Sequence, residues 1–488
     1  MISHPFDDTI AAISTPTGLG GIGIVRLSGP NALGLAAEIF RPAAKDRSVL
    51  DQESFTTCYG RVIGDAGEAV DEAILTVMRA PRTYTTQDVV EINCHGGIVP
   101  LRRTLELVLH HGARLADPGE FTKRAFYFGR IDLAQAEAVC DIINARTEEA
   151  HRAAMEQLQG RLSGEVHALR EGILDLVTHL EAAIDFGEDD IELVSSEAQG
   201  ECLEALLAHI GQLLAEADSG RALREGLRAA IVGRPNVGKS SLMNALLGES
   251  RVIVTEIPGT TRDVVEDAVN IGGIPVILAD TAGLRDTEDV VENAGVERAR
   301  AMMNRADLVL LVMDGSQPLQ PEDAQLLGDV PADKTLLVLN KQDLPQQWDA
   351  PRGEERSPVA DDGGEGSPPH AETVFRPDRI VPVSATQHTG LDALRERITQ
   401  MVWHGHAGPS GEALVTNVRH KDALERAEMA LTHARGTLAT GLTEEYVVED
   451  LREALDALGE IIGTTFAGDR TQNEEIINRI FESFCIGK

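Results

Sequence analysis

The sequence predicts an α/β protein with an added helical domain, and three observations carry this prediction. Residues 1–128 alternate strand-like apolar runs with short helical segments, which is typical of a mixed α/β unit. Apolar side chains from 158 to 184 recur every three to four positions, and this helical pattern resumes at 412. Between the two helical stretches, apolar strands enter loops of fixed sequence. The simplest arrangement is one helical domain that a nucleotide-binding domain interrupts.

The N-terminal segment contains the predicted strands IGIVRLS, TCYGRVI, AVDEAILTVM and DVVEINCHGG, with helices over NALGLAAEIF and 99–111. Gly18, Gly20, Gly21 and Gly23 imitate a dinucleotide fingerprint, but they precede a strand instead of joining a strand to a helix. We therefore expect a turn with close backbone approach at these glycines. The helical segments are 129–226 and 403–488, and the domain between them is 227–402.

A phosphate-binding loop organises the domain between the two helical segments. AAIVGRPNVGKSS fits G-x-x-x-x-G-K-[ST], with Gly233, Gly238, Lys239 and Ser240 at the fixed positions. The glycines allow backbone N–H groups to approach phosphates, the lysine reaches the β/γ oxygens, and the serine is suited to Mg²⁺. A match of this length alone would also fit an ordinary tight turn.

Four further motifs follow in order, and together they exclude an ordinary tight turn. GTTRD supplies Thr261, which could complete the Mg²⁺ shell, and DTAG begins with Asp280 after the strand IPVILA. TLLVLN leads into Asn-Lys-Gln-Asp, and RIVPVSA ends in Ser-Ala. Asn-Lys-x-Asp resembles the guanine-reading motif, whose carboxylate accepts two N–H groups that adenine cannot supply, so a Ras-like P-loop GTPase domain is expected. The predicted GTP-binding residues are Asn236, Val237, Gly238, Lys239, Ser240, Ser241, Thr255, Glu256, Ile257, Pro258, Gly259, Thr260, Thr261, Asp280, Thr281, Ala282, Gly283, Asn340, Lys341, Asp343, Ser384 and Ala385.

The segment 345–379 is rich in proline, glycine and acidic residues and lies between the guanine motif and the next strand. We expect a disordered surface insertion, because added loop length costs little free energy. A tethering role is the alternative.

Composition excludes several classes of protein. No apolar run reaches 18 residues, and the N-terminus lacks a basic region followed by an apolar core, so we expect a cytoplasmic protein without membrane span or signal peptide. The five cysteines show no C-x-x-C spacing, which argues against structural zinc and disulfides. A net charge of −35 has the wrong sign for general adhesion to nucleic acid and is most simply a matter of solubility.

The order of motifs resembles the MnmE (TrmE) family of tRNA-modification GTPases over essentially the whole chain. GRPNVGKSSLMNAL, VTEIPGTTRD and DTAGLR fit many GTPases, whereas GEFTKRAF, DLAQAEAV and the terminal Cys-Ile-Gly-Lys single out this family. The resemblance implies a homodimer whose N-terminal domain binds tetrahydrofolate and mediates dimerisation. It also implies a heterotetramer with the FAD-dependent partner MnmG, which would hold most of the tRNA. The implied reaction adds an aminomethyl or carboxymethylaminomethyl group to C5 of the wobble uridine.

By the same resemblance, 5-formyl- or methylene-tetrahydrofolate would bind to Arg26, Glu91, Arg130 and Lys488. The carboxylate suits pterin N–H groups, and the cations suit the glutamate tail or the formyl oxygen. Position 130 carries arginine where the family often has lysine. Cys485 would lie beside this site, as a catalytic thiol or as a structural residue.

The resemblance also implies how GTP is hydrolysed. Leu284 follows DTAG where Ras-like enzymes have the glutamine that orients water, and Glu292 is the implied substitute. A potassium ion would supply charge in place of an arginine finger. Its implied ligands are Asn236, Thr255, Ile257 and Thr260.

Two other functions compete with tRNA modification. A ribosome-assembly GTPase of the Era or Der kind would need a basic RNA-binding module such as a KH domain, and no basic C-terminal segment is present. A GTP-gated scaffold without chemistry of its own is the second alternative.

Overall fold

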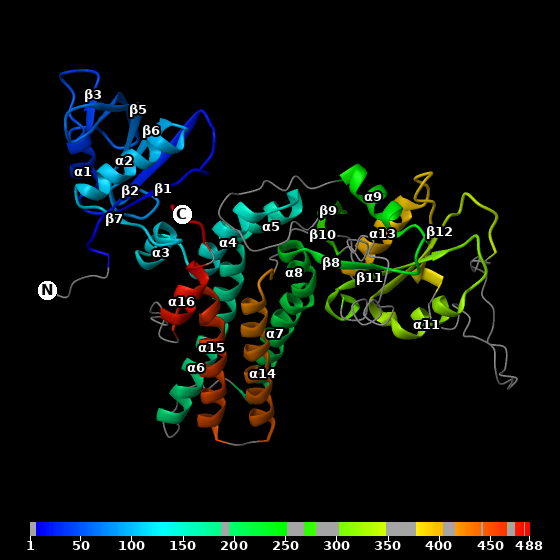
Figure 1. The fold of residues 1–488 in the computed structure, drawn as a ribbon. Helices are drawn as coiled ribbons and strands as arrows, with labels where there is room; N and C mark the ends of the chain where they lie inside the picture. The colour runs from blue at the N-terminus through cyan, green and yellow to red at the C-terminus, as the bar shows by residue number, and fades with distance from the viewer. Residues whose placement is uncertain are drawn as a thin grey trace, which may run out of the picture.

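The computed structural model describes residues 6–186, 195–250, 268–279, 302–347, 377–403, 415–440, 443–465, 474–482 and 484–488. An N-terminal α/β unit and a nucleotide-domain sheet lie on opposite sides of a helical bundle (Figure 1). This arrangement confirms the predicted fold class of two α/β units with a discontinuous helical domain between them. In the part of the chain that the structure describes, no helix is both long and apolar enough to cross a membrane.

The N-terminal unit is a seven-stranded sheet of order β3-β4-β5-β6-β2-β1-β7, antiparallel except for the β1–β7 pair. Its strands are β1 (Ile10–Ile13), β2 (Ile22–Ser28), β3 (Phe40–Pro42), β4 (Thr56–Ile63), β5 (Ala69–Met78), β6 (Val89–His95) and β7 (Arg114–Leu115). Helices α1 (Ala32–Ile39) and α2 (Ile98–His110) pack on one face, where alternate residues of β4, β5 and β6 are buried. Part of the other face is open, since Tyr59 and Ile74, which pair across β4 and β5, are 56% and 46% exposed.

Close approach is observed at Gly20 and at Gly23, of which Gly23 lies within β2 and not before it. Gly20 donates a backbone hydrogen bond to the carbonyl of Gly96 at 3.0 Å, and a Cβ on Gly96 would lie 2.4 Å from the carbonyl oxygen of Gly20. A Cβ on Gly23 would overlap the Leu101 side chain of α2 at 2.4 Å. Gly18 and Gly21 have open space around them.

The helical domain is discontinuous in sequence. The first part holds α4 (Leu133–Asn144), α5 (Glu148–Leu158), α6 (Arg161–Phe186), α7 (Ser196–Ala215) and α8 (Ala217–Glu225), and the second holds α14 (Val418–Thr440), α15 (Glu444–Ile462) and α16 (Glu474–Phe481). Helix α3 (Glu120–Tyr127) precedes them in the N-terminal unit, where Phe121 packs with Ile10 and Ala12. Helices α6, α7, α14 and α15 share one hydrophobic core, which includes the periodic residues Leu162, Val166, Leu169 and Ile173. That core joins chain segments on either side of the inserted domain (Figure 1).

The inserted domain is a six-stranded sheet of order β13-β12-β11-β8-β10-β9, in which only β9 runs antiparallel to its neighbour. Its strands are β8 (Leu227–Val232), β9 (Ala268–Ile271), β10 (Ile274–Ala279), β11 (Leu308–Asp314), β12 (Thr335–Asn340) and β13 (Ile380–Pro382). Helices α9 (Lys239–Ser250) and α13 (Leu391–Val402) cover one face, and α11 (Pro321–Asp329) covers the other. Most of the predicted insertion, 348–376, lies outside the described residues.

Candidate functional site: a nucleotide loop and an interdomain cavity

The phosphate loop joins β8 to α9 in the predicted strand-to-helix context. Gly233, Asn236 and Gly238 adopt positive φ angles of 153°, 64° and 99°. Glycine tolerates these conformations freely and asparagine tolerates the left-handed one, so the loop can turn its backbone N–H groups inward. Helix α9 begins at Lys239, which places its positive N-terminus beside the loop.

Lys239 lies over the loop that it completes. Its Nζ donates hydrogen bonds to the carbonyls of Gly233 at 2.9 Å and Arg234 at 2.7 Å. The ammonium group is thus held at the loop in a position from which it can turn to phosphate oxygens. Ser240 and Ser241 follow on the first turn of α9.

Asn340 ties the guanine motif to the phosphate loop. Its side-chain Nδ2 donates to the carbonyl of Val237 at 2.9 Å, and its Oδ1 accepts the backbone N–H of Ala385 at 3.1 Å. A Cβ on Gly238 would lie 2.2 Å from that Nδ2, so glycine is required there for this approach as well as for its φ angle. Three separated segments therefore meet at one buried amide.

Asp343, the residue predicted to read the base, lies beside Ser384. Ser384 Oγ donates to Asp343 Oδ1 at 2.6 Å, and the aspartate is exposed at the surface of the domain. Lys341 Nζ pairs with Asp314 Oδ2 at 2.7 Å, which fixes the turn that carries Asp343. Although burial opposes it, the hydrogen bonds from Lys341 and Ser316 lower the pKa of Asp314. The carboxylate of Asp314 therefore stays ionised beneath the guanine motif.

The remaining predicted nucleotide residues lie outside the described residues. These are Thr255, Glu256, Ile257, Pro258, Gly259, Thr260, Thr261, Asp280, Thr281, Ala282 and Gly283, together with Glu292. Of the residues predicted to bind potassium or magnesium, only Asn236 and Ser240 are among the described residues.

A second candidate site is a cavity of about 580 Å³ between the N-terminal sheet and the helical domain. Arg26, Glu91, Arg130 and Lys488, which are far apart in sequence, all line it. Residues of α4 and α5 form much of its apolar side. The other lining residues are Met78, Tyr84, Val89, Ile131, Gln135, Val139, Ile142, Ile143, Met155 and Leu158.

Charged groups gather at the polar end of this interdomain cavity. The Arg26 guanidinium pairs with Glu91 Oε1 at 2.8 Å and also donates to the carbonyl of Gly487 at 3.3 Å. Burial, and then the charge of Arg26, lower the pKa of Lys488. The Arg130 guanidinium lies 4.8 Å from the ring centroid of Tyr84. Such a set can bind a planar ligand that offers N–H donors and anionic oxygens.

The C-terminal tail is docked against the N-terminal unit. The N–H of Phe121 donates to the carbonyl of Lys488 at 3.1 Å, and that of Gly119 donates to the carbonyl of Cys485 at 3.4 Å. Gly487 has a φ of 95°, and a Cβ there would lie 2.4 Å from the carbonyl oxygen of Ile13. Cys485 is exposed and is not one of the residues that line the cavity.

Sequence reasoning missed part of both sites. Asp314 ends a predicted strand, and its position one strand before the guanine motif is a signal that could have found it. Tyr84 and the α4–α5 residues of the cavity carry no local motif. Their role depends on the packing of the helical domain against the sheet, which spacing in sequence does not reveal.

Two family models match the chain. The "GTP-binding protein TrmE N-terminus" model matches residues 9–130, and the "MnmE helical domain" model matches residues 133–485. The second match extends across the inserted domain, as expected for a discontinuous helical domain.

Curated relatives match over nearly the full length. A "tRNA modification GTPase MnmE" from Heliobacterium modesticaldum is 48% identical over 488 residues, with 99% of each chain covered. Proteins of the same description from Geobacillus kaustophilus and Alkaliphilus metalliredigens are 46% and 45% identical over 483 residues, again with 99% of each chain covered.

Proposed function

The chain belongs to the MnmE family of tRNA modification GTPases, and from this premise we propose the reaction that it serves. With an FAD-dependent partner of the MnmG kind, it adds an aminomethyl or carboxymethylaminomethyl group to C5 of the wobble uridine of certain tRNAs. A tetrahydrofolate supplies the one-carbon unit, and potassium-dependent GTP hydrolysis drives the cycle. The observation that carries the proposal is the convergence of Arg26, Glu91, Arg130 and Lys488 on one cavity, in a chain whose full-length relatives are described as tRNA modification GTPases.

The nucleotide half of the proposal assigns roles to the phosphate loop and the guanine motif. Lys239 binds the β/γ-phosphates, Asp343 accepts the guanine N–H groups, and Ser240 with Thr261 holds Mg²⁺. Potassium would bind to Asn236, Thr255, Ile257 and Thr260, and Glu292 would orient the attacking water. Asn236 lies within the phosphate loop with a φ of 64°, a conformation that asparagine tolerates, and its side-chain oxygen is a suitable potassium ligand.

The donor set of the interdomain cavity fits a tetrahydrofolate. A pterin edge presents N–H donors that suit Glu91, and the glutamate tail presents carboxylates that suit Arg130 and Lys488. The apolar side formed by α4 and α5 suits the flat aromatic parts of the molecule. Cys485, one turn of the tail away from Lys488, is the candidate thiol for the carbon transfer.

The association states are part of the same proposal. The open part of the N-terminal sheet carries Ile22, Tyr59 and Ile74, which are 66%, 56% and 46% exposed. Exposed large apolar side chains on a sheet face support pairing with a second copy through residues 1–128. The acidic balance of the chain supports a partner that holds most of the tRNA. The proposed tRNA modification would take place in the cytoplasm, where tRNA is found.

Relatives that cover 99% of the chain are described as tRNA modification GTPases, which favours tRNA modification over ribosome assembly of the Era or Der kind.

Direct binding tests the folate assignment. Titration calorimetry with 5-formyl-tetrahydrofolate should give binding to the wild type that Glu91→Gln weakens at least about tenfold, because a charge-assisted hydrogen bond is lost. Glu72→Gln is the matched control, since Glu72 lies on the neighbouring strand and pairs with Arg61 on the exposed surface. No binding by the wild type, or equal weakening by both variants, would remove the folate from the cavity.

A further inference from the structure

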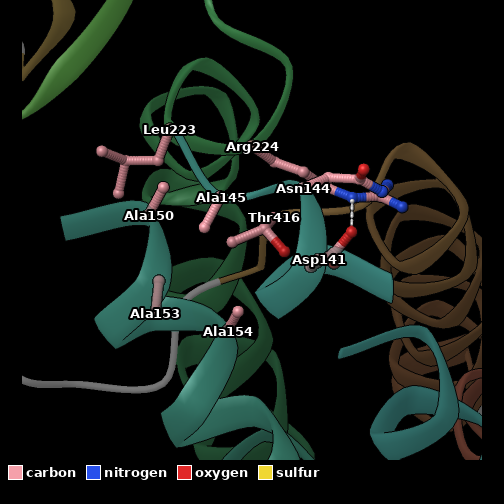
Figure 2. A pocket seen from close by; sticks show the side chains of 9 residues that line it. All are labelled: Asp141, Asn144, Ala145, Ala150, Ala153, Ala154, Leu223, Arg224 and Thr416. Atoms are coloured by element: carbon pink, nitrogen blue, oxygen red, sulfur yellow. Dashed lines mark hydrogen bonds and ion pairs between the residues drawn. The ribbon is translucent and has the colours of Figure 1, made fainter. Parts of the chain in front are cut away.

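Helices α4 and α5 separate the interdomain cavity from the inserted GTPase domain. On one side, Val139, Ile142 and Ile143 of α4 and Met155 and Leu158 of α5 line the interdomain cavity. On the other side, Asp141 and Asn144 of α4 and Ala150, Ala153 and Ala154 of α5 line a second, small cavity against α8 (Figure 2). The two helices therefore contact the interdomain cavity on one side and, on the other, α8, the helix that leads into the GTPase domain.

The contact with α8 reaches the phosphate loop with little intervening chain. Helix α8 ends at Glu225, and β8 begins at Leu227 and runs directly to Gly233. Leu223 of α8 and Ala153 of α5 belong to the same hydrophobic core as the residues of β8 and α9. A displacement of α8 would thus shift β8 and the phosphate loop that follows it.

The segment that follows the GTPase domain, at Val415 and Thr416, packs beside the same small cavity. Thr416 lines the small cavity and donates to Gln157 Oε1 at 3.2 Å, while Gln157 Nε2 donates to the carbonyl of Ala134 in α4 at 2.9 Å. A Cβ on Gly220 of α8 would lie 2.3 Å from the carbonyl oxygen of Val415. Both connections of the inserted domain are therefore packed together beside α4 and α5.

One ion pair bridges α4 and α8. Arg224 Nε pairs with Asp141 Oδ1 at 2.7 Å, and the two side chains point toward each other across the junction (Figure 2). Asp141 Oδ2 is buried and makes no hydrogen bond within the described residues. The pair is thus one-pronged, although arginine and carboxylate readily form two parallel bonds. A shift of α8 that gave the pair its second bond would be a second arrangement of this contact.

Helix α4 itself is fixed to the bundle. Glu137, one turn before Asp141, is buried and accepts two hydrogen bonds from the Arg419 guanidinium of α14, at 2.9 and 2.8 Å. His420 Nε2 lies 2.7 Å from the same carboxylate. Helix α4 is thus anchored to α14, and it contacts α8 through the Asp141–Arg224 pair.

We propose that α4 and α5 transmit occupancy of the interdomain cavity to the GTPase domain, with the Asp141–Arg224 pair as the contact that carries the signal. The cavity ligand and the nucleotide would then alter each other's affinity by the same factor, because coupling between two binding sites is reciprocal. The proposal rests on the proposed function only for the identity of the cavity ligand.

The test compares 5-formyl-tetrahydrofolate binding to the full chain loaded with GDP or with a non-hydrolysable GTP analogue. We expect the two dissociation constants to differ at least about fivefold, the low end of typical coupling. Asp141→Asn, which keeps the side-chain shape, and Arg224→Gln should each bring the ratio close to one while both ligands still bind. Arg221→Gln is the matched control, since Arg221 lies on α8 but pairs with Asp307 at 3.3 Å, and it should keep the wild-type ratio.

A second readout does not need the folate. Hydrogen–deuterium exchange of residues 133–158 should differ between the two nucleotide states in the wild type and in Arg221→Gln, and should not differ in Arg224→Gln. Equal folate affinities together with unchanged exchange would overturn the coupling and leave the folate assignment in place. If the wild type does not bind folate but its exchange still depends on the nucleotide, the folate assignment is overturned and the coupling stands. If Arg224→Gln kept both effects, or Arg221→Gln lost them, the ion pair would not be the carrier.

Discussion

The Asn340 side chain donates a hydrogen bond to the carbonyl of Val237 at 2.9 Å, although 103 residues separate them. The bond joins the predicted phosphate loop to the predicted guanine motif. If both bind the nucleotide as proposed, their separation is fixed before it arrives, which lowers the cost of ordering the site. The neighbouring Asp343 gains its orientation from the same turn.

Asp343→Asn should change the base preference. The carboxylate accepts two guanine N–H groups, whereas an amide there must turn one N–H toward them, so GTP affinity should fall at least about tenfold. Xanthosine triphosphate, with a carbonyl in place of the amino group, should bind the variant better than GTP does. Competition between the two nucleotides measures this, and an unchanged preference for GTP would show that Asp343 does not read the base.

Potassium should be required for GTP turnover. Replacing K⁺ by Na⁺ at equal ionic strength should slow hydrolysis at least about tenfold, a part of the ~10³–10⁵ that an added cation supplies in related enzymes. Asn236→Ala should remove the potassium response and leave nucleotide binding by Lys239 and Asp343 largely intact. Asn236→Gly is the control for backbone strain, because the φ of 64° suits glycine better than alanine. Equal rates in the two salts would contradict the prediction.

Glu292→Ala should bind GTP normally and hydrolyse it about 10²–10³ times more slowly, since only an interaction with the attacking water is lost. Single-turnover kinetics separates binding from chemistry. A wild-type rate would make Glu292 an ordinary surface residue.

Cys485→Ser should leave folding, dimerisation and GTP hydrolysis intact and abolish wobble-uridine modification in cells. A thiolate is a far better nucleophile than a serine hydroxyl. Lys488, three residues after Cys485, is a nearby cation that favours the thiolate form. If the serine variant restores normal modified-nucleoside levels to a deletion strain, the thiol is structural and the tail serves only for binding.

The sequence predicts local elements well where the period of the apolar pattern is clear. The run AVDEAILTVM is the strand β5, and the helix expected at 99–111 is observed at Ile98–His110. The phosphate loop was equally predictable, because phosphate binding imposes fixed residues at fixed spacing within one segment. The order of the strands in the two sheets lies beyond such patterns.

The gathering of distant residues was not derivable from the residues alone. Arg130 and Lys488 line one cavity only because the tail returns to the N-terminal unit and Phe121 binds its last carbonyl. The family resemblance named these residues, but not Tyr84 or the apolar residues of α4 and α5. Likewise, Asp141 and Arg224 lie in ordinary helical sequence, and only packing shows that they form a pair between α4 and α8.

Mass spectrometry of tRNA nucleosides tests whether GTP hydrolysis by this chain serves tRNA modification. A strain that lacks this gene should lose the aminomethyl-type substituents at the wobble uridine, and the wild-type chain should restore them while Lys239→Ala, which cannot hold the phosphates, should not. Unchanged modified wobble uridine in the deletion strain, or full restoration by Lys239→Ala, would contradict the account that GTP hydrolysis by this chain serves tRNA modification.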